Sequence, residues 1–142
     1  MISTDRIVWD LPTRFIHWAL ATCVVLNLFI LEEGEDLHAW TGYAAVVIVV
    51  LRFAWGFLGQ VPIRNRIASL VYIGIWSLIL GLGITGWMMG LDAYWGEDWI
   101  EELHANFSIG LQILIGLHFL GIIIDSVRYR RRTWLAMIRG YK

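Results

Sequence analysis

Four apolar runs, each about long enough to cross a bilayer, constrain this 142-residue chain more than any other feature. We place them at about residues 15–31, 38–58, 68–91 and 104–124. The hydrophobic share of 58% exceeds the roughly one half that is usual for soluble domains. The sequence therefore predicts an all-α membrane protein, a four-transmembrane-helix bundle that forms a single domain over residues 1–142 and is surrounded by membrane lipid.

Charge along the chain predicts the direction of each span. All eleven Lys and Arg fall on one side of a four-span arrangement. Nine of the twelve acidic residues fall on the other side, in the links 32–37 and 92–103. Because cytoplasmic segments of membrane proteins carry the excess of Lys and Arg, we expect both termini to be cytoplasmic. No nucleic-acid partner is expected.

All four histidines lie at or near the ends of the predicted spans. His17 lies near the cytoplasmic start of the first span, and His38 near the outer start of the second. The fourth span holds His104 at its outer start and His118 near its cytoplasmic end. A spacing of fourteen residues separates these two by roughly 21 Å along a helix and by about 40° around its axis. Sorted by depth, the histidines form an outer pair, His38 with His104, and an inner pair, His17 with His118.

Paired histidines at two depths favour two b-type haems, each with two axial imidazoles. A single four-histidine metal cluster is excluded because the pairs lie roughly 20 Å apart. Two separate metal ions would each need further ligands, whereas a haem brings four nitrogens of its own. The single cysteine, Cys23, allows no Cys-x-x-Cys-His attachment, so a haem would be held non-covalently. A proton or metal pathway and purely structural histidines remain the alternatives.

Two arginines lie near the expected depth of the inner pair. Arg14 precedes His17 by three residues, about one helical turn, and Arg52 follows His38 by fourteen. Either guanidinium could neutralise haem propionates. The alternative is that both side chains extend to the cytoplasmic headgroups, as many arginines at such depths do.

Several segments resemble the bacterial cytochrome b-561 family, which includes hydrogenase-type cytochrome b subunits. They are VWDLPTRFIHW at 8–18, LHAWTGYAAVVIVVLRFAWGFLG at 37–59, EELHANFSIGLQILIGLHFLGIIIDSVRYR at 101–130 and MIRGYK at 137–142. The resemblance implies four helices in the bacterial inner membrane and two haems b, with the axial pairs His17–His118 and His38–His104. In one region the chain departs from the family: many relatives have a longer segment between spans two and three, where this chain has only VPIRNRIASL.

The resemblance implies an electron carrier that links the quinone pool to a periplasmic redox protein, such as a c-type cytochrome. The acidic outer links could steer a basic partner. Some family members are similar to superoxide oxidases, which reduce ubiquinone, but an acidic outer rim attracts an anion poorly. A non-redox haem-handling protein is the third hypothesis. No catalytic residue is assigned, a quinone is a candidate substrate, and the oligomeric state is left open.

Overall fold

The computed structural model describes residues 9–58, 66–130 and 132–140, and these ranges are helical without any strand. Helices α1 to α4 are each long and apolar enough to cross a membrane. A 3₁₀ turn, η1, precedes α4, and a short helix, α5, follows it. The bounds are α1 Leu11–Phe29, α2 Asp36–Leu58, α3 Arg66–Met89, η1 Asp92–Tyr94, α4 Asp98–Arg128 and α5 Thr133–Arg139. The prediction of an all-α protein with four membrane-spanning helices is therefore confirmed.

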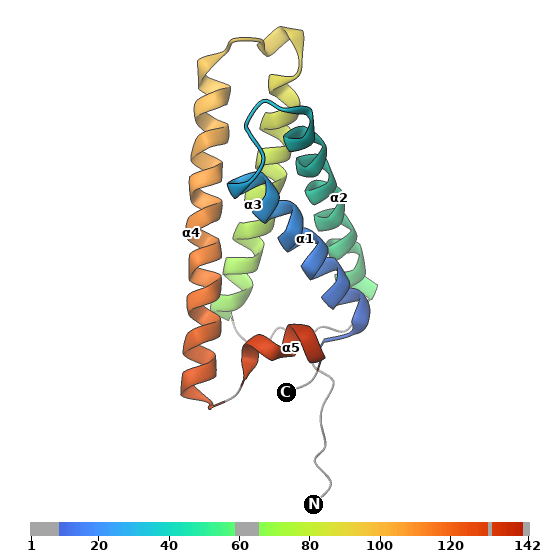
Figure 1. Cartoon of the computed structure of the whole chain (residues 1–142), viewed down its shortest axis with the longest axis vertical. Helices are drawn as coiled ribbons and strands as arrows, with labels where there is room; N and C mark the ends of the chain where they lie inside the picture. The colour runs from blue at the N-terminus through green and yellow to red at the C-terminus, as the bar shows by residue number, and fades with distance from the viewer. Residues whose placement is uncertain (1–8, 59–65, 131, 141–142) are drawn as a thin grey trace, which may run out of the picture.

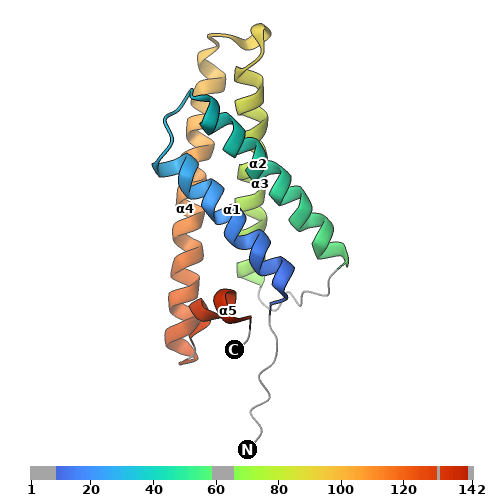
Figure 2. The same cartoon turned by 45° about the vertical axis from the view of Figure 1, so that its right-hand side comes forward.

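The spans pack in sequence order, with α1 against α2, α2 against α3 and α3 against α4. Helices α3 and α4 run side by side, while α1 and α2 form a second, inclined pair (Figures 1 and 2). Helix α5 lies across the lower end of the bundle (Figure 1). There the backbone N–H of Trp9 donates to the carbonyl of Gly140 at 3.2 Å. Both ends of the described chain thus meet at one end of the bundle.

The tightly packed interior is small and draws on all four spans. Its buried members are Leu20, Ala45, Val49, Ile79 and Leu111. Many large apolar side chains lie on the outside instead. Lipid is as apolar as these side chains, so an outward apolar face carries no hydrophobic penalty in a membrane. The distribution is that of a multi-pass membrane protein.

The helix ends differ from the predicted spans by up to six residues, most at the start of α4. Helix α4 begins at Asp98, six residues before the predicted start, because Asp98 and Glu101 occupy its first turn, where carboxylates stabilise the positive end of a helix. Helix α5 was not predicted, since seven residues are too few to show helical periodicity. The segment between predicted spans two and three falls largely on residues 59–65, outside the described residues.

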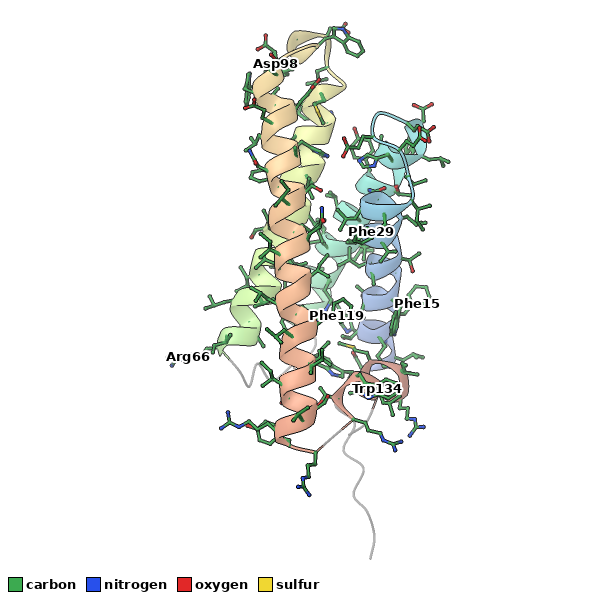
Figure 3. The ribbon with its side chains drawn as sticks, turned by 60° about the vertical axis from the view of Figure 1, so that its left-hand side comes forward. Phe15, Phe29, Arg66, Asp98, Phe119 and Trp134 are labelled. Atoms are coloured by element: carbon green, nitrogen blue, oxygen red, sulfur yellow. The ribbon has the colours of Figure 1, made fainter. Side chains whose placement is uncertain are left out.

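Charges separate to opposite ends of the bundle, as the sequence predicts for the described part of the chain. In Figure 3, Arg66 lies toward the end that carries α5, and Asp98 lies at the other end. The basic end also carries Arg128, Arg130, Arg132 and Arg139 around α5. Both acidic connections, between α1 and α2 and between α3 and α4, lie at the far end (Figure 1).

Candidate functional site

The inner histidine pair joins α1 to α4. The ring centroids of His17 and His118 lie 6.3 Å apart, with their planes at 51°. Two aromatic rings pack edge-on against this pair. Trp18 lies 5.5 Å from His17, and Tyr72 of α3 lies 5.5 Å from His118. Residues of three helices, α1, α3 and α4, therefore meet at the inner pair.

The outer pair joins α2 to α4 with the same spacing. The centroids of His38 and His104 lie 6.3 Å apart, with their planes at 58°. Helix α3 contributes Thr85, whose Oγ1 lies 2.7 Å from Nδ1 of His104. Both pairs thus share α4, and each takes its second histidine from a different helix.

The start of α1 is fixed next to the inner pair by a side-chain cap. Asp10 accepts a hydrogen bond from the backbone N–H of Thr13 at 3.2 Å and another from Nε1 of Trp55 at 2.8 Å. Such a cap satisfies a backbone donor that the first helical turn leaves free. Partial burial raises the pKa of Asp10, but these hydrogen bonds and the nearby charge of Arg52 outweigh it, so the pKa lies below its ordinary value. The ionised carboxylate therefore ties α1 to α2.

The start of α2 is fixed next to the outer pair by Asn27 of α1. With its amide nitrogen turned toward the neighbouring oxygens, Asn27 donates to the backbone carbonyl of His38 at 3.3 Å and to Oγ1 of Thr41. Its amide oxygen then accepts from the N–H of Gly42 at 3.0 Å. A Cβ at Gly42 would come within 3.3 Å of this amide, so the glycine admits the close approach. Asn27 thereby sets the position of the α2 turn that carries His38.

The spacing within each pair fits two imidazoles that bind one metal from opposite sides. A metal–imidazole bond is about 2.0–2.1 Å and a ring nitrogen lies roughly 1.2 Å from its centroid, so two such rings have centroids about 6.4 Å apart. Both observed separations are 6.3 Å. Within the described ranges, no group of three or more His, Cys, Asp or Glu side chains could hold a bare ion. A donor set of two imidazoles per site suits haem, which brings its own four nitrogens.

The two predicted arginines lie in different surroundings. Arg52 packs over the Trp76 ring at 5.7 Å, and its charge acts on both His17 and Asp10. Arg14 instead donates through Nε to the backbone carbonyl of Met137 in α5 at 3.2 Å. Arg52 is thus an electrostatic neighbour of the inner pair, and Arg14 has a structural partner at the C-terminal helix.

Sequence reasoning missed the residues that support the histidines from neighbouring helices. Thr85, Tyr72 and Asn27 each contact a histidine or its backbone. Each carries a polar group inside a membrane-spanning helix, which is the signal that could have identified them. Their partners depend on interhelical packing, which spacing along one helix does not reveal.

Comparison with known proteins gives one match. A family model described as prokaryotic cytochrome b561 matches residues 8–140, nearly the whole chain. No curated protein and no solved structure matches the chain significantly.

Proposed function

The chain belongs to the prokaryotic cytochrome b561 family, and on that premise we propose that it carries electrons across the bacterial inner membrane between two b-type haems. It would link the quinone pool to a periplasmic redox protein such as a c-type cytochrome. The observation that carries this proposal is the pair of matched imidazole spacings, one toward each end of α4. The positive-inside rule assigns the arginine-rich end with α5 to the cytoplasm and the acidic loops to the periplasm.

In this proposal the four histidines would hold the haems, His17 with His118 at the inner site and His38 with His104 at the outer site. A haem bound there would supply reversible one-electron chemistry, and two imidazole ligands per haem favour electron transfer over oxygen binding. Helix α4 holds His104 and His118 roughly 21 Å apart along its axis. Both sites therefore share one rigid element, which keeps their separation constant.

The charges near the inner pair have a proposed role of their own. Arg52 lies within electrostatic reach of His17, so it could neutralise a propionate at the inner site. Arg14 lies one helical turn before His17 and could also neutralise a propionate, although its Nε donates to the Met137 carbonyl. Trp18 and Tyr72 pack edge-on beside the inner imidazoles.

Proteoliposomes test whether electrons cross the membrane. Haem-loaded protein is reconstituted with ferricyanide trapped inside, and a membrane-impermeant reductant is added outside. We expect the wild-type protein to reduce the trapped ferricyanide rapidly, and His104→Ala and His118→Ala each to abolish this, because each breaks one pair. A wild-type rate equal to that of protein-free liposomes would contradict the proposal.

A second assay tests the partner. Vesicles in which the acidic loops face outward are supplied with a quinol and with a basic soluble c-type cytochrome. We expect the cytochrome to be reduced, at a rate that falls as salt screens the acidic surface. Fast quinone reduction by superoxide, with no protein partner and no cytochrome reduction, would instead assign the chain to the superoxide oxidases.

A further inference from the structure

Thr85 of α3 makes a contact with His104 that was not predicted from sequence. Its side chain is 4% exposed, and its Oγ1 lies 2.7 Å from Nδ1 of His104. The same oxygen lies 2.9 Å from the carbonyl of Gly81 and 3.2 Å from that of Leu82, one turn earlier in α3. Because the hydroxyl is buried, water does not compete for it, and its hydrogen-bond partners are His104 and these two carbonyls.

The direction of the Thr85–His104 bond depends on which ring nitrogen of His104 carries the proton. In the proposed ligation His104 binds the haem iron through Nε2, so its proton lies on Nδ1 and is donated to Oγ1 of Thr85. A hydroxyl has one proton to donate, and Thr85 then donates it to the carbonyl of Gly81, the usual backbone contact of a threonine inside a helix. Nε2 of His104 is left without a proton and free to bind a metal.

The other outer histidine lacks such a partner. Nδ1 of His38 is buried and makes no hydrogen bond to any described residue. Among the histidines of the described chain, His104 is the one whose ring nitrogen has a hydrogen-bond partner. An outside partner that accepts the Nδ1 proton orients a histidine ligand and raises its basicity. The two ligands of the outer site are therefore unequal, and α4 supplies the stronger donor.

We propose that Thr85 is the positioning residue of the outer site: its hydroxyl holds His104 with Nε2 toward the iron and lowers the reduction potential of the outer haem. This inference rests on the proposed haem ligation by His104. Stronger donation from the imidazole stabilises the ferric form more than the ferrous form. Helix α3, which supplies no predicted ligand, thus tunes one of the two sites.

Redox titration of the haem-loaded full chain tests this role with three variants. Thr85→Val removes the hydroxyl at nearly constant volume, and Thr85→Ser keeps it. Thr22→Val is the matched control, because the Thr22 hydroxyl bonds only the Trp18 carbonyl of its own helix among the described residues. We expect Thr85→Val to raise the ferrous-to-ferric ratio of one haem, at a fixed ambient potential, about threefold to tenfold, a shift of up to about 59 mV for one electron.

The remaining outcomes are equally decisive. Wild-type potentials in Thr85→Ser and Thr22→Val, with a change in the low-spin ferric resonance of one haem in Thr85→Val, would support the role. Loss of one haem from Thr85→Val, with both retained in Thr85→Ser, would also support it. Unchanged potentials and resonances in Thr85→Val, or equal shifts in Thr85→Val and Thr22→Val, would overturn it. If Thr85→Val does not fold, the smaller Thr85→Ala replaces it. A wild-type chain that binds no haem would instead refute the proposed function.

Discussion

His104 and His118 lie on one helix, yet each faces a histidine from a different neighbour. His118 meets His17 of α1, and His104 meets His38 of α2. At the scale of single residues, each proposed haem site therefore depends on two histidines and is lost when either histidine is removed. Removing one imidazole leaves the other pair intact, because the two pairs share only the backbone of α4.

Substitution of single histidines tests this independence. We expect His118→Ala to lose the inner haem and keep the outer one, and His38→Ala to show the reverse. Each variant should therefore bind about half the haem of the wild type, with complementary reduced-minus-oxidised spectra. Equal loss of both haems in both variants, in protein that is still folded, would mean that the pairing is wrong.

The Asp10 cap predicts a pH effect on stability. The pKa of Asp10 is lowered in the folded chain, so its stabilisation is fully present above the ordinary carboxyl pKa of about 3.9. As the pH falls below that value the unfolded chain takes up a proton first, and the stabilisation is lost progressively toward the lowered folded pKa. Thermal unfolding of Asp10→Asn should therefore occur at a lower temperature than wild type at pH 7. The difference in unfolding temperature should shrink below pH 4. A difference that does not change with pH would show that the charge of Asp10 does not contribute to the cap.

From sequence, a site residue could be predicted only where its depth in the membrane is enough to identify its neighbours. The four histidines fall at two depths because successive spans alternate in direction. Pairing them by depth therefore requires no knowledge of how the helices pack. Thr85 and Tyr72 lie at the same levels, but on the span with no histidine. Their contacts depend on how α3 is rotated against α4, and the few scattered polar residues of α3 do not reveal that rotation.

The elements are held together by close helix contacts at glycines and by the docking of α5. A Cβ at Gly83 of α3 would collide with Cγ2 of Val46 in α2, and one at Gly74 would lie 2.7 Å from Cδ1 of Leu114 in α4. Small residues at membrane helix interfaces allow such approaches. At the basic end, the Met137 carbonyl of α5 accepts from both Arg14 Nε and Trp18 Nε1, at 3.2 and 3.1 Å.

Alanine at Gly83 should weaken the contact between α2 and α3. Overpacking costs about 1–3 kcal/mol, which exceeds the about 1 kcal/mol that better helix propensity contributes. We expect Gly83→Ala to unfold at a lower temperature in detergent. Gly90→Ala is the control, because the nearest atom to its added Cβ, the Trp87 carbonyl oxygen, lies at an ordinary 3.4 Å. Equal melting temperatures in the two variants would contradict the close contact.

Alanine at Gly140 should release α5. Gly140 has φ of +82°, and an added Cβ would lie 2.9 Å from Nη1 of Arg14 and 3.1 Å from the Trp9 carbonyl oxygen. A left-handed backbone alone costs a non-glycine residue about 1–2 kcal/mol. We expect trypsin to cleave Gly140→Ala faster than wild type after Arg132 and Arg139. Gly34→Ala carries a similar strain at φ +86° with no atom within 4 Å, so it should leave this cleavage unchanged. Equal cleavage of all three proteins would argue against docking.

At the scale of the whole molecule, the charged ends and the two histidine pairs lie along one axis. The arginine-rich end lies next to the inner pair, and the acidic loops lie next to the outer pair. Span number and this polarity could be predicted from sequence, because hydrophobicity and charge act residue by residue. Helix α5 could not, because its position depends on two donors in α1 that meet one carbonyl, Met137, more than a hundred residues away.

Haem stoichiometry tests the central claim most directly. The purified, fully loaded chain is converted to its pyridine haemochrome, and haem is counted against protein determined by amino-acid analysis. Two imidazole pairs with matched spacing predict two b-type haems per chain, both low-spin. One haem or none per chain in well-loaded, folded protein would contradict the account.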